Sequence, residues 1–293
     1  MIDLRKRSEP DDEDNELVRP APQSQNVGMA DQRKDTWAAG NLYEPYIGRW
    51  SRLVAREFLQ WLGAPAHRAW LDVGCGTGAL TQTILQDQHP RSITAIDPSA
   101  AFIDHAQAHT NDARVTFDVA DAQSLPVQSA SIDVAVAGLV INFVADPLLA
   151  VREMTRAVVA GGRVAAYVWD YAGKMELMRY FWDAAVALDP DAQHLDEGHR
   201  FPLCKPAALV ALLNQANLRD VSAQAIDVAT TFQDFDDYWG PFLGGQGPAP
   251  GYAMSLSEQG RGALRERIFE TLPIASDGTI PLTARAWAVR GTV

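Results

Sequence analysis

A short apolar run followed at once by closely spaced glycines constrains the fold of this chain more than any other feature. Residues 69–73 read as a buried strand, Gly74, Gly76 and Gly78 follow at alternate positions, and a helical pattern begins at Ala79. Strand, glycine turn and helix in this order present backbone N–H groups to a nucleotide-like ligand in α/β proteins. Glycine suits such a turn because it adopts conformations that other residues avoid and lets a ligand approach closely. The glycines alone leave the ligand open, since they also satisfy a relaxed dinucleotide fingerprint.

Composition argues against several classes of function. The chain has 293 residues and a formal net charge of −12, without the basic cluster that a nucleic-acid partner requires. No apolar run approaches the roughly 20 residues of a membrane helix, and the N-terminus lacks the apolar core of a signal peptide, so we expect a cytoplasmic protein without membrane association. Two cysteines, Cys75 and Cys204, are too few for a disulfide framework or a metal cluster. His194 and His199 match no metal-ligand spacing, and we expect no metal.

The pattern along the chain predicts an acidic tail and one α/β domain. Residues 1–35 are acidic and lack apolar periodicity, which is typical of disorder, and residues 36–293 are expected to form the domain. Within it, residues 36–63 are expected to be an N-terminal lid that packs over the sheet or lines a ligand pocket. The aromatic segments 171–205 and 231–275 are expected to cap the substrate.

Strands and helices alternate over the central part of the chain, which is typical of a parallel sheet with helices on its faces. A helix is expected over 147–159, ended by Gly161-Gly162, and the residues of 189–205 and 244–251 are expected to be irregular or flexible. The expected strands are 69–73, 93–96, 115–119, 132–137 and 163–169, followed late in the chain by 221–228 and 282–289.

Side chains at the ends of four successive strands distinguish between the possible ligands. Asp72 precedes the glycines. A carboxylate at this position could bind a ligand's ammonium group, whereas a dinucleotide has no group that requires it. Asp97 ends the second strand, where a carboxylate accepts hydrogen bonds from ribose hydroxyls, and Asp121 ends the third, placed for an adenine amine. Gly138-Leu139 ends the fourth strand with small and apolar residues. S-adenosylmethionine has the matching groups, whereas a nicotinamide cofactor would leave Asp72 and Asp121 without a role.

Each of these carboxylates also has a structural interpretation. Asp72 could cap the turn, Asp97 could cap the next helix, and Asp121 could be a solvated loop residue. Asp133 begins its strand, away from the ligand edge, and we assign it a structural role.

These motifs together resemble the class I S-adenosylmethionine-dependent methyltransferases, in the broad small-molecule group that includes ubiquinone/menaquinone-biosynthesis-like enzymes. The resemblance rests on the run 71–78, on Asp97 and Asp121-Ala122, and on the segment from Asp146-Pro147 to Gly162, where Ala160 replaces the family's usual proline. It implies a Rossmann-like seven-stranded sheet of order 3-2-1-4-5-7-6, with the last strand antiparallel and helical lid and cap insertions. It also implies S-adenosyl-L-methionine as cofactor and S-adenosyl-L-homocysteine as product.

The predicted function is methyl transfer by in-line displacement to a small-molecule acceptor, with the nucleophile (O, N, S or C) and the catalytic residues left open. A nicotinamide- or flavin-dependent oxidoreductase and a catalytically silent cofactor-binding protein are the alternatives. For each aromatic residue, core packing is the competing interpretation. The expected cofactor-binding residues are Tyr43, Arg52, Asp72, Gly74, Cys75, Gly76, Asp97, Pro98, Ser99, Asp121, Ala122 and Leu139, and the expected substrate-binding residues are Tyr46, Trp50, Asn142, Phe143, Trp169, Arg200, Phe201, Tyr238 and Trp239.

Overall fold

A computed structural model of the chain describes residues 48–244 and 247–293. Tyr43, Tyr46 and the expected tail of residues 1–35 lie outside the described residues. The described part contains a seven-stranded sheet of order β3-β2-β1-β4-β5-β7-β6, in which β7 runs antiparallel to both of its neighbours. This confirms the predicted strand order and the antiparallel last strand. The strands are β1 (Ala69–Val73), β2 (Ser92–Asp97), β3 (Val115–Val119), β4 (Ile132–Gly138), β5 (Val158–Trp169), β6 (Arg219–Phe232) and β7 (Ile280–Thr292).

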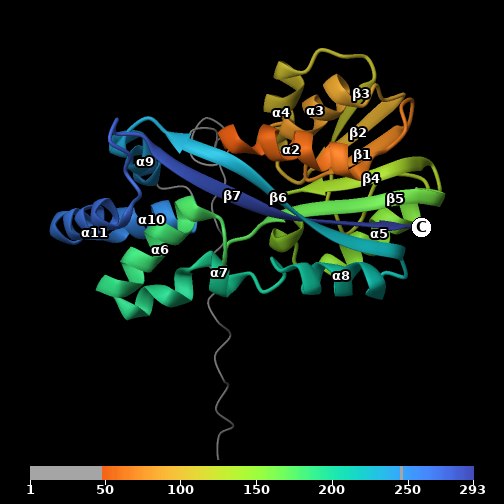
Figure 1. The fold of residues 1–293 in the computed structure, drawn as a ribbon. Coiled ribbons are helices and arrows are strands. Elements are labelled where there is room, and N and C mark those ends of the chain that lie inside the picture. Colours follow the sequence, from red (N-terminus) through yellow and green to blue (C-terminus); the bar gives the residue numbers. More distant parts are fainter. Residues whose placement is uncertain (1–47, 245–246) are drawn as a thin grey trace, which may run out of the picture. The chain divides into compact units, whose positions relative to one another are not determined.

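Helices cover both faces of this sheet. Figure 1 shows α2 (Arg49–Leu62), α3 (Ala79–Asp87) and α4 (Ala100–His109) on one face and α5 (Pro147–Ala157) and α8 (Pro206–Gln215) on the other. Within the described residues no helix has the length and apolar character needed to cross a membrane.

The amphipathic helix α2 is fixed to the sheet by its apolar face and by its C-terminal carbonyls. Val54, Phe58 and Leu62 form this apolar face and are fully buried. At its end, Arg290 Nη1 donates to the carbonyl oxygen of Trp61 at 2.6 Å, and Arg163 Nη1 donates to that of Gly63 at 3.0 Å. Because a helix leaves its last carbonyls without internal partners, these two cations cap α2 and hold it across the sheet.

The strands β6 and β7 are longer than the predicted 221–228 and 282–289. Trp169, the last residue of β5, pairs with Ala286, and Ala286 pairs on its other side with Ile226. The remainder of β6, up to Phe232, pairs with β7 only, so the two strands continue as a ribbon past the end of β5.

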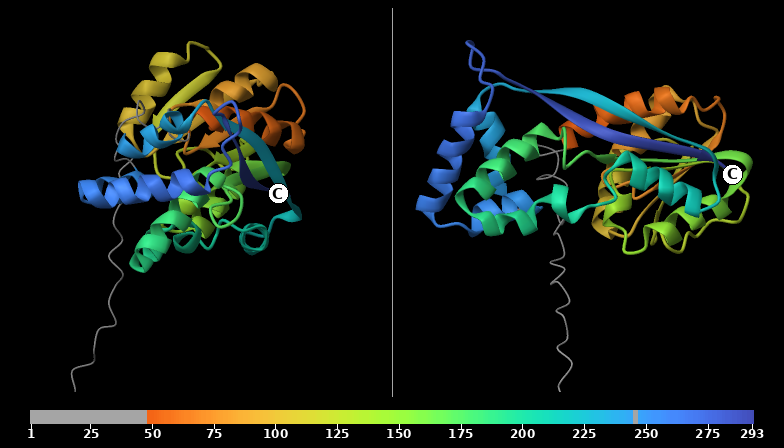
Figure 2. Two further views of the ribbon diagram at one scale, coloured as in Figure 1. Left: turned by 60° about the vertical axis from the view of Figure 1, so that its left-hand side comes forward. Right: turned by 60° about the horizontal axis from the view of Figure 1, so that its bottom comes forward.

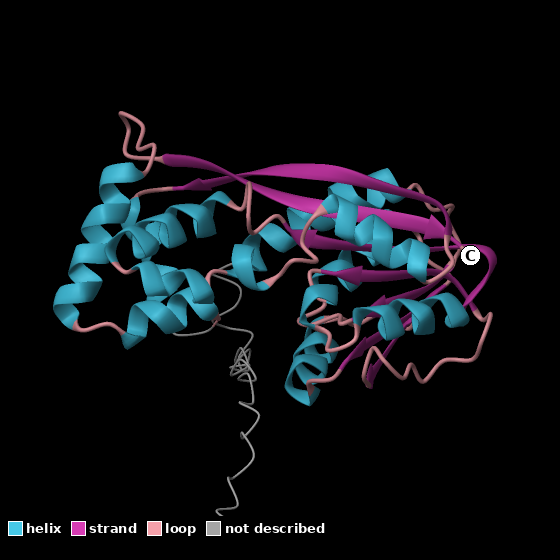
Figure 3. Cartoon of the chain, turned by 90° about the horizontal axis from the view of Figure 1, so that it is seen from below, coloured by secondary structure: helices cyan, strands magenta, loops and turns pink. Residues whose placement is uncertain are grey.

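Helical segments gather at the far end of this ribbon, as Figures 1, 2 and 3 show. We call them the cap helices; the name describes their position and does not imply that they bind a substrate. They are α6 (Glu176–Leu188), η3 (Pro190–Leu195), α7 (Glu197–Arg200), α9 (Phe235–Trp239), η4 (Gly240–Gly244), α10 (Pro248–Ser255) and α11 (Glu258–Thr271).

Three local predictions were wrong. The helix expected over 147–159 ends at Ala157, because Val158 already pairs with Ile132 of β4 and the β-branched valines continue as a strand. The residues of 189–205, expected to be irregular, contain η3 and α7, which begin at the side-chain caps Asp189 and Asp196. The segment expected to be flexible, 244–251, contains the start of α10, where Pro248 supplies the preset backbone angle of a first helical turn.

Candidate functional site

A cavity of about 360 Å³ opens at the carboxyl ends of β1, β2, β4 and β5, which is the edge where α/β sheets bind ligands. Its volume lies within the range of small-molecule sites. Most of its lining comes from the glycine turn, the end of β2 and the ends of β4 and β5. The lining residues are Ser51, Gly74, Cys75, Gly76, Thr77, Ala79, Asp97, Pro98, Ser99, Phe102, Gly138, Leu139, Val140, Phe143, Tyr167, Trp169 and Tyr171.

The glycine turn is fixed against β2 and against the loop after β4. The backbone N–H groups of Gly74 and Cys75 both donate to the carbonyl oxygen of Ile96, at 2.8 and 2.9 Å. Gly74 has φ +73°, and a Cβ added to it would lie 2.5 Å from Val140 Cγ2. Gly76 has φ +54°, but a Cβ there would meet no atom within 4 Å. The two glycines therefore serve different purposes: Gly74 permits close packing, and Gly76 leaves open space beside the cavity.

Asp97 braces this turn and also lines the cavity. Its Oδ2 accepts from the N–H of Gly76 at 3.0 Å, and its Oδ1 accepts from the N–H of Ser99 at 2.9 Å. Burial raises the pKa of this carboxyl, while the two backbone hydrogen bonds oppose the shift. Ser99 in turn caps α4 by accepting from the N–H of Phe102. The structural interpretation of Asp97 and its position in the cavity are therefore compatible.

Asp72 is buried behind the glycines with half of its carboxylate unpaired. Its Oδ2 accepts from Thr81 Oγ1 at 2.6 Å, whereas Oδ1 has no hydrogen-bond partner among the described residues. The side chain is 1% exposed, and burial raises its pKa to about 7, with the charge of Asp97 adding to the shift. Unpaired buried carboxylate oxygens are costly, so Oδ1 is the position at which a cationic ligand group would be accommodated.

Four of the expected cofactor residues in the described part of the chain lie outside the cavity lining: Asp72, Arg52, Asp121 and Ala122. Asp121 is exposed and accepts from the N–H of Gln123 at 2.9 Å, as expected for a solvated loop residue. Ala122, next to it, is buried. Arg52 lines another cavity, of about 380 Å³, where it donates to Gln82 Oε1 at 3.4 Å. Thr77 lines both cavities, so Arg52 is a neighbour of the main cavity and does not line it.

Aromatic side chains form part of the cavity wall. Phe143 and Trp169, both expected there, line it together with Tyr167 and Tyr171, which the sequence analysis missed. A signal was present for Tyr167, because residues spaced by two along a strand share one face and β5 contains both Tyr167 and Trp169, whereas Tyr171 follows the strand in a turn. The Tyr167 hydroxyl lies 2.7 Å from where a Cβ on Gly138 would be, which explains the glycine at the end of β4.

Phe201, Arg200 and Asn142 lie outside the lining. Phe201 packs edge-on against Phe143, with ring centroids 5.1 Å apart, and against Tyr171 at 5.6 Å. Arg200 lies over the Phe201 ring at 5.3 Å. Phe201 therefore supports two of the lining rings from behind.

The structure places Tyr238 and Trp239 in the interior of the cap helices and not in the cavity. The Tyr238 hydroxyl donates to the carbonyl oxygen of Leu177 at 2.8 Å, and the residue is fully buried. Trp239 packs on Phe242 at 6.0 Å. Trp50 packs edge-on against Phe232, at 5.6 Å, and also lies outside the lining. The contacts of Tyr238 and Trp239 are those of core packing, because an aromatic-rich amphipathic segment buries its rings wherever a second layer of helices covers them.

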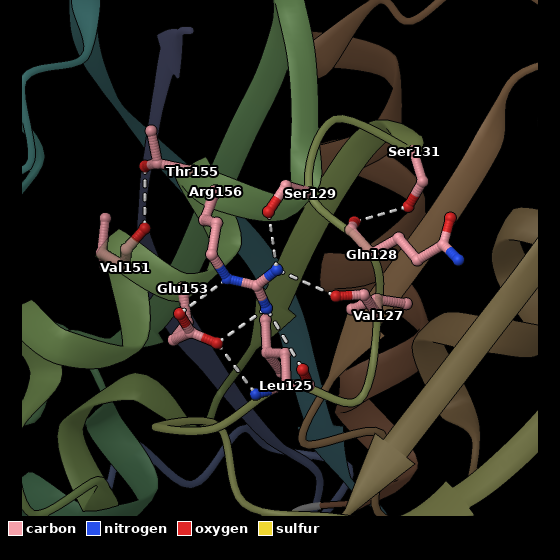
Figure 4. Close-up of polar contacts among 9 residues, drawn as sticks. All are labelled: Leu125, Val127, Gln128, Ser129, Ser131, Val151, Glu153, Thr155 and Arg156. Carbon is pink, nitrogen blue, oxygen red and sulfur yellow. Dashed lines mark hydrogen bonds and ion pairs between the residues drawn. The ribbon is translucent and has the colours of Figure 1, made fainter.

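The loop that follows β3 is held by one charged network (Figure 4). Arg156 donates to both carboxylate oxygens of Glu153, each at 2.8 Å, and to the carbonyl oxygens of Val127 and Leu125 at 2.9 and 3.2 Å. Glu153 Oε2 also accepts from the N–H of Leu125 at 3.1 Å. These hydrogen bonds hold the pKa of Glu153 below its usual range. The network fixes the path of the chain between β3 and β4.

Replacing Arg156 by glutamine is expected to lower the free energy of unfolding by about 1–2 kcal/mol, because two backbone carbonyls and a carboxylate lose their donor. Urea denaturation measures this change. Arg114 is the matched control: it pairs with Asp112 through two bonds, at 2.9 and 2.7 Å, on the exposed surface. We expect Arg114→Gln to leave the midpoint unchanged. Equal effects of the two substitutions would contradict the anchoring role of Arg156.

Comparisons with known proteins agree with this geometry. Residues 71–166 match a family model described as "Methyltransferase domain". Malonyl-[acyl-carrier protein] O-methyltransferase of Hahella chejuensis is 35% identical over 94 residues, which are 32% of this chain and 34% of that protein. The matched region thus spans about a third of this chain and of the curated relative.

Two solved structures share the fold. A putative methyltransferase from an antibiotic biosynthesis pathway of Anabaena variabilis superposes with a TM-score of 0.57 at 17% identity, over 82% of this chain and 97% of that one. Phosphoethanolamine N-methyltransferase 2 of Haemonchus contortus, in complex with S-adenosyl-L-methionine, gives 0.52 at 14% identity, over 81% and 51%. At these identities the likeness establishes the fold.

Proposed function

We propose, from the premise that this chain belongs to the class I S-adenosylmethionine-dependent methyltransferases, that it transfers a methyl group from this cofactor to a small organic acceptor. Residues 71–166 carry the family's domain. The observation that most supports the proposal is the pairing of Asp97 with the glycine turn at the cavity, with the unpaired Oδ1 of Asp72 behind it.

The residues present fit the cofactor group by group. Asp97 would accept from the ribose hydroxyls, and Asp72 Oδ1 would receive the ammonium, directly or through a water molecule. Gly76 leaves room for close approach to the turn. Pro98, Ser99 and Phe102 line the cavity next to Asp97, on the side where the adenine would lie. Asp121, Arg52 and Tyr43 remain proposals for the adenine amine, the carboxylate and the lid.

The bound cofactor supplies an activated methyl group on a sulfonium sulfur. The chain has to hold the acceptor atom in line with that group at near-attack distance and keep water out. Phe143, Tyr167, Trp169 and Tyr171 form the wall suited to this, because aromatic rings favour a neighbouring cation and exclude water. We assign the acceptor to small molecules and leave the methylated atom unassigned. The two named relatives act on different groups, since one is an O-methyltransferase and the other an N-methyltransferase.

Calorimetric titration tests the cofactor first. S-adenosylmethionine and S-adenosylhomocysteine are expected to bind, and NAD is not, because a nicotinamide cofactor has no ammonium for Asp72. Binding of NAD with neither adenosyl compound would favour an oxidoreductase. A labelled-methyl screen across phenols, thiols, amines and carboxylic acids follows. Tight cofactor binding without transfer to any acceptor would favour a silent binding protein.

Cofactor affinity is expected to depend on pH through Asp72. Its folded pKa of about 7 exceeds the ordinary aspartate value of 3.8, so the free protein holds this proton at pH 6 and must release it to pair with an ammonium. Affinity should therefore weaken by up to about tenfold per unit as the pH falls below about 7. Because its pKa is higher in the folded state, the protonated Asp72 carboxyl stabilises the unliganded fold at low pH. This contribution to stability is lost as the pH rises from the unfolded pKa to the folded pKa of about 7.

Calorimetry across this pH range measures the effect in the wild type and in Asp72→Asn. The asparagine variant should bind more weakly and show a flatter pH profile, because no proton has to leave. Identical profiles in the two proteins would exclude Asp72 from the ammonium site.

A further inference from the structure

Close to the ion pair that links α2 to α9, four buried polar atoms on α2 and β6 lack partners within the described chain. They are Arg49 Nε, Arg49 Nη2, Trp50 Nε1 and Thr230 Oγ1, all buried and all without a hydrogen-bond partner among the described residues. Leaving a buried donor unpaired is destabilising, and such groups are rare in native proteins. Arg49 and Trp50 are in contact, and Thr230 lies two residues before Phe232, whose ring also contacts Arg49, which favours a site whose partner is a ligand.

The Arg49 guanidinium is held on three sides. Its Nη1 donates to Asp237 Oδ1 at 2.9 Å. Its carbon Cζ lies 4.5 Å from the centre of the Trp50 ring and 4.6 Å from that of Phe232. The edge formed by Nε and Nη2 remains unused. This edge presents two parallel N–H groups, which match the two oxygens of a carboxylate.

This group of atoms lies at the ligand edge of the sheet. β5 and β6 both run antiparallel to β7 and are therefore parallel to each other, so their carboxyl ends point the same way. Thr230 lies in the part of β6 that continues beyond the end of β5. On α2, the residue after Trp50 is Ser51, which lines the main cavity. Arg49 thus lies two residues before a residue of the cavity lining on the same helix, while Arg52, one residue after Ser51, lines the neighbouring cavity.

We propose that Arg49 binds a carboxylate carried by the methyl acceptor, with Trp50 Nε1 and the Thr230 hydroxyl as further donors. This rests on the proposed methyl transfer and assigns its substrate class: small acids that carry a separate nucleophile. Asp237 and the two rings preset the guanidinium, so little rotamer freedom is lost when the acceptor binds. The competing role is purely structural, a link between α2 and α9.

The test uses matched pairs of acceptors with the full-length protein. Hydroxybenzoic, aminobenzoic and mercaptobenzoic acids, each beside its methyl ester, are offered with labelled S-adenosylmethionine. Transfer is expected to favour an acid over its ester. Arg49→Gln should raise KM for that acid by about tenfold or more and leave the Kd of S-adenosylmethionine unchanged. Arg49→Lys should restore part of the loss, because it keeps the charge without the two-pronged edge.

Arg265→Gln is the matched control. Arg265 of α11 pairs with Asp236 of α9 at 3.1 Å, and its carbon Cζ lies 4.7 Å from the centre of the Phe235 ring, so it repeats the kinds of contact that Arg49 makes without the buried free edge. This variant should keep the wild-type KM. Thr230→Val removes a hydroxyl without touching the ion pair, and it should raise KM for the acid even if Arg49→Gln folds poorly.

The outcomes separate the two proposals. If S-adenosylmethionine does not bind, the proposed function is wrong, and the same acids titrated onto wild type and Arg49→Gln still test the carboxylate site by calorimetry. If the cofactor binds but esters serve as well as acids, or the KM of Arg49→Gln equals that of wild type, the carboxylate site is overturned while the methyltransferase proposal stands.

Discussion

Gly74→Ala is expected to destabilise the fold by about 3 kcal/mol or more and to abolish cofactor binding. The new methyl group would lie 2.5, 2.8 and 2.9 Å from Cγ2, Cγ1 and Cβ of Val140, so either the glycine turn or the loop after β4 has to move. The backbone at φ +73° adds strain for any residue with a Cβ. Both segments line the cavity, and a shift in either removes its shape. Thermal unfolding and calorimetric titration with S-adenosylhomocysteine measure the two effects.

Gly76→Ala separates strain from collision. It has the same kind of backbone angle, but nothing lies within 4 Å of its added Cβ, so the expected loss of stability is only about 1 kcal/mol. Its methyl group instead occupies space beside the cavity and should weaken cofactor binding in a well-folded protein. Adding Val140→Ala to Gly74→Ala removes the two closest contacts and should recover part of the stability. If Gly74→Ala proved as stable as Gly76→Ala, the collision would not exist.

Asp97→Ala is expected to raise the Kd of S-adenosylmethionine by about two orders of magnitude. The substitution removes a carboxylate that would bind two ribose hydroxyls, and each charge-assisted hydrogen bond contributes about 1.5–3 kcal/mol. It also leaves the N–H groups of Gly76 and Ser99 without their acceptor, so the turn and the start of α4 lose their common brace. Asp97→Asn keeps one acceptor oxygen, so its affinity for S-adenosylmethionine should fall less than that of Asp97→Ala. Direct titration of the purified variants measures each constant.

Asp133→Ala provides the control for a purely structural aspartate. Asp133 accepts from the N–H of Ala69 at 2.8 Å and pairs with Arg68 and Arg91, at the opposite end of β1 from the cavity. Its loss should lower stability and leave cofactor affinity unchanged. Should Asp97→Ala behave in the same way, with normal affinity and reduced stability, Asp97 would be a structural brace only.

The sequence predicted those parts of the molecule that depend on local rules and on strand ends. A glycine turn after a strand and carboxylates at the next strand ends must meet at one edge once the strands pair in parallel. Accordingly Gly74, Gly76, Asp97, Pro98 and Ser99 all line one cavity. The order of the seven strands, implied by the family resemblance, is confirmed as well. Asp121 shows the limit of this rule, because its side chain is exposed beside Gln123 although it follows a strand end.

Beyond β5 the sequence alone could not place the aromatic residues. Tyr238 and Tyr171 look alike as tyrosines in aromatic segments, yet one is buried among the cap helices and the other lines the cavity. The difference is set by which layer covers each segment, and that depends on contacts between distant parts of the chain.

Arg49 illustrates most clearly what only the tertiary structure decided. In the sequence it is one more cation at the start of an amphipathic helix, with no signal that separates it from Arg52. Its partner Asp237 lies 188 residues further along the chain, and the rings on its two faces come from α2 and β6. Local sequence fixed the glycine turn because its conformation is determined by neighbouring residues. The free edge of a guanidinium is determined by what packs on its other sides, and the folded chain alone brings those groups together.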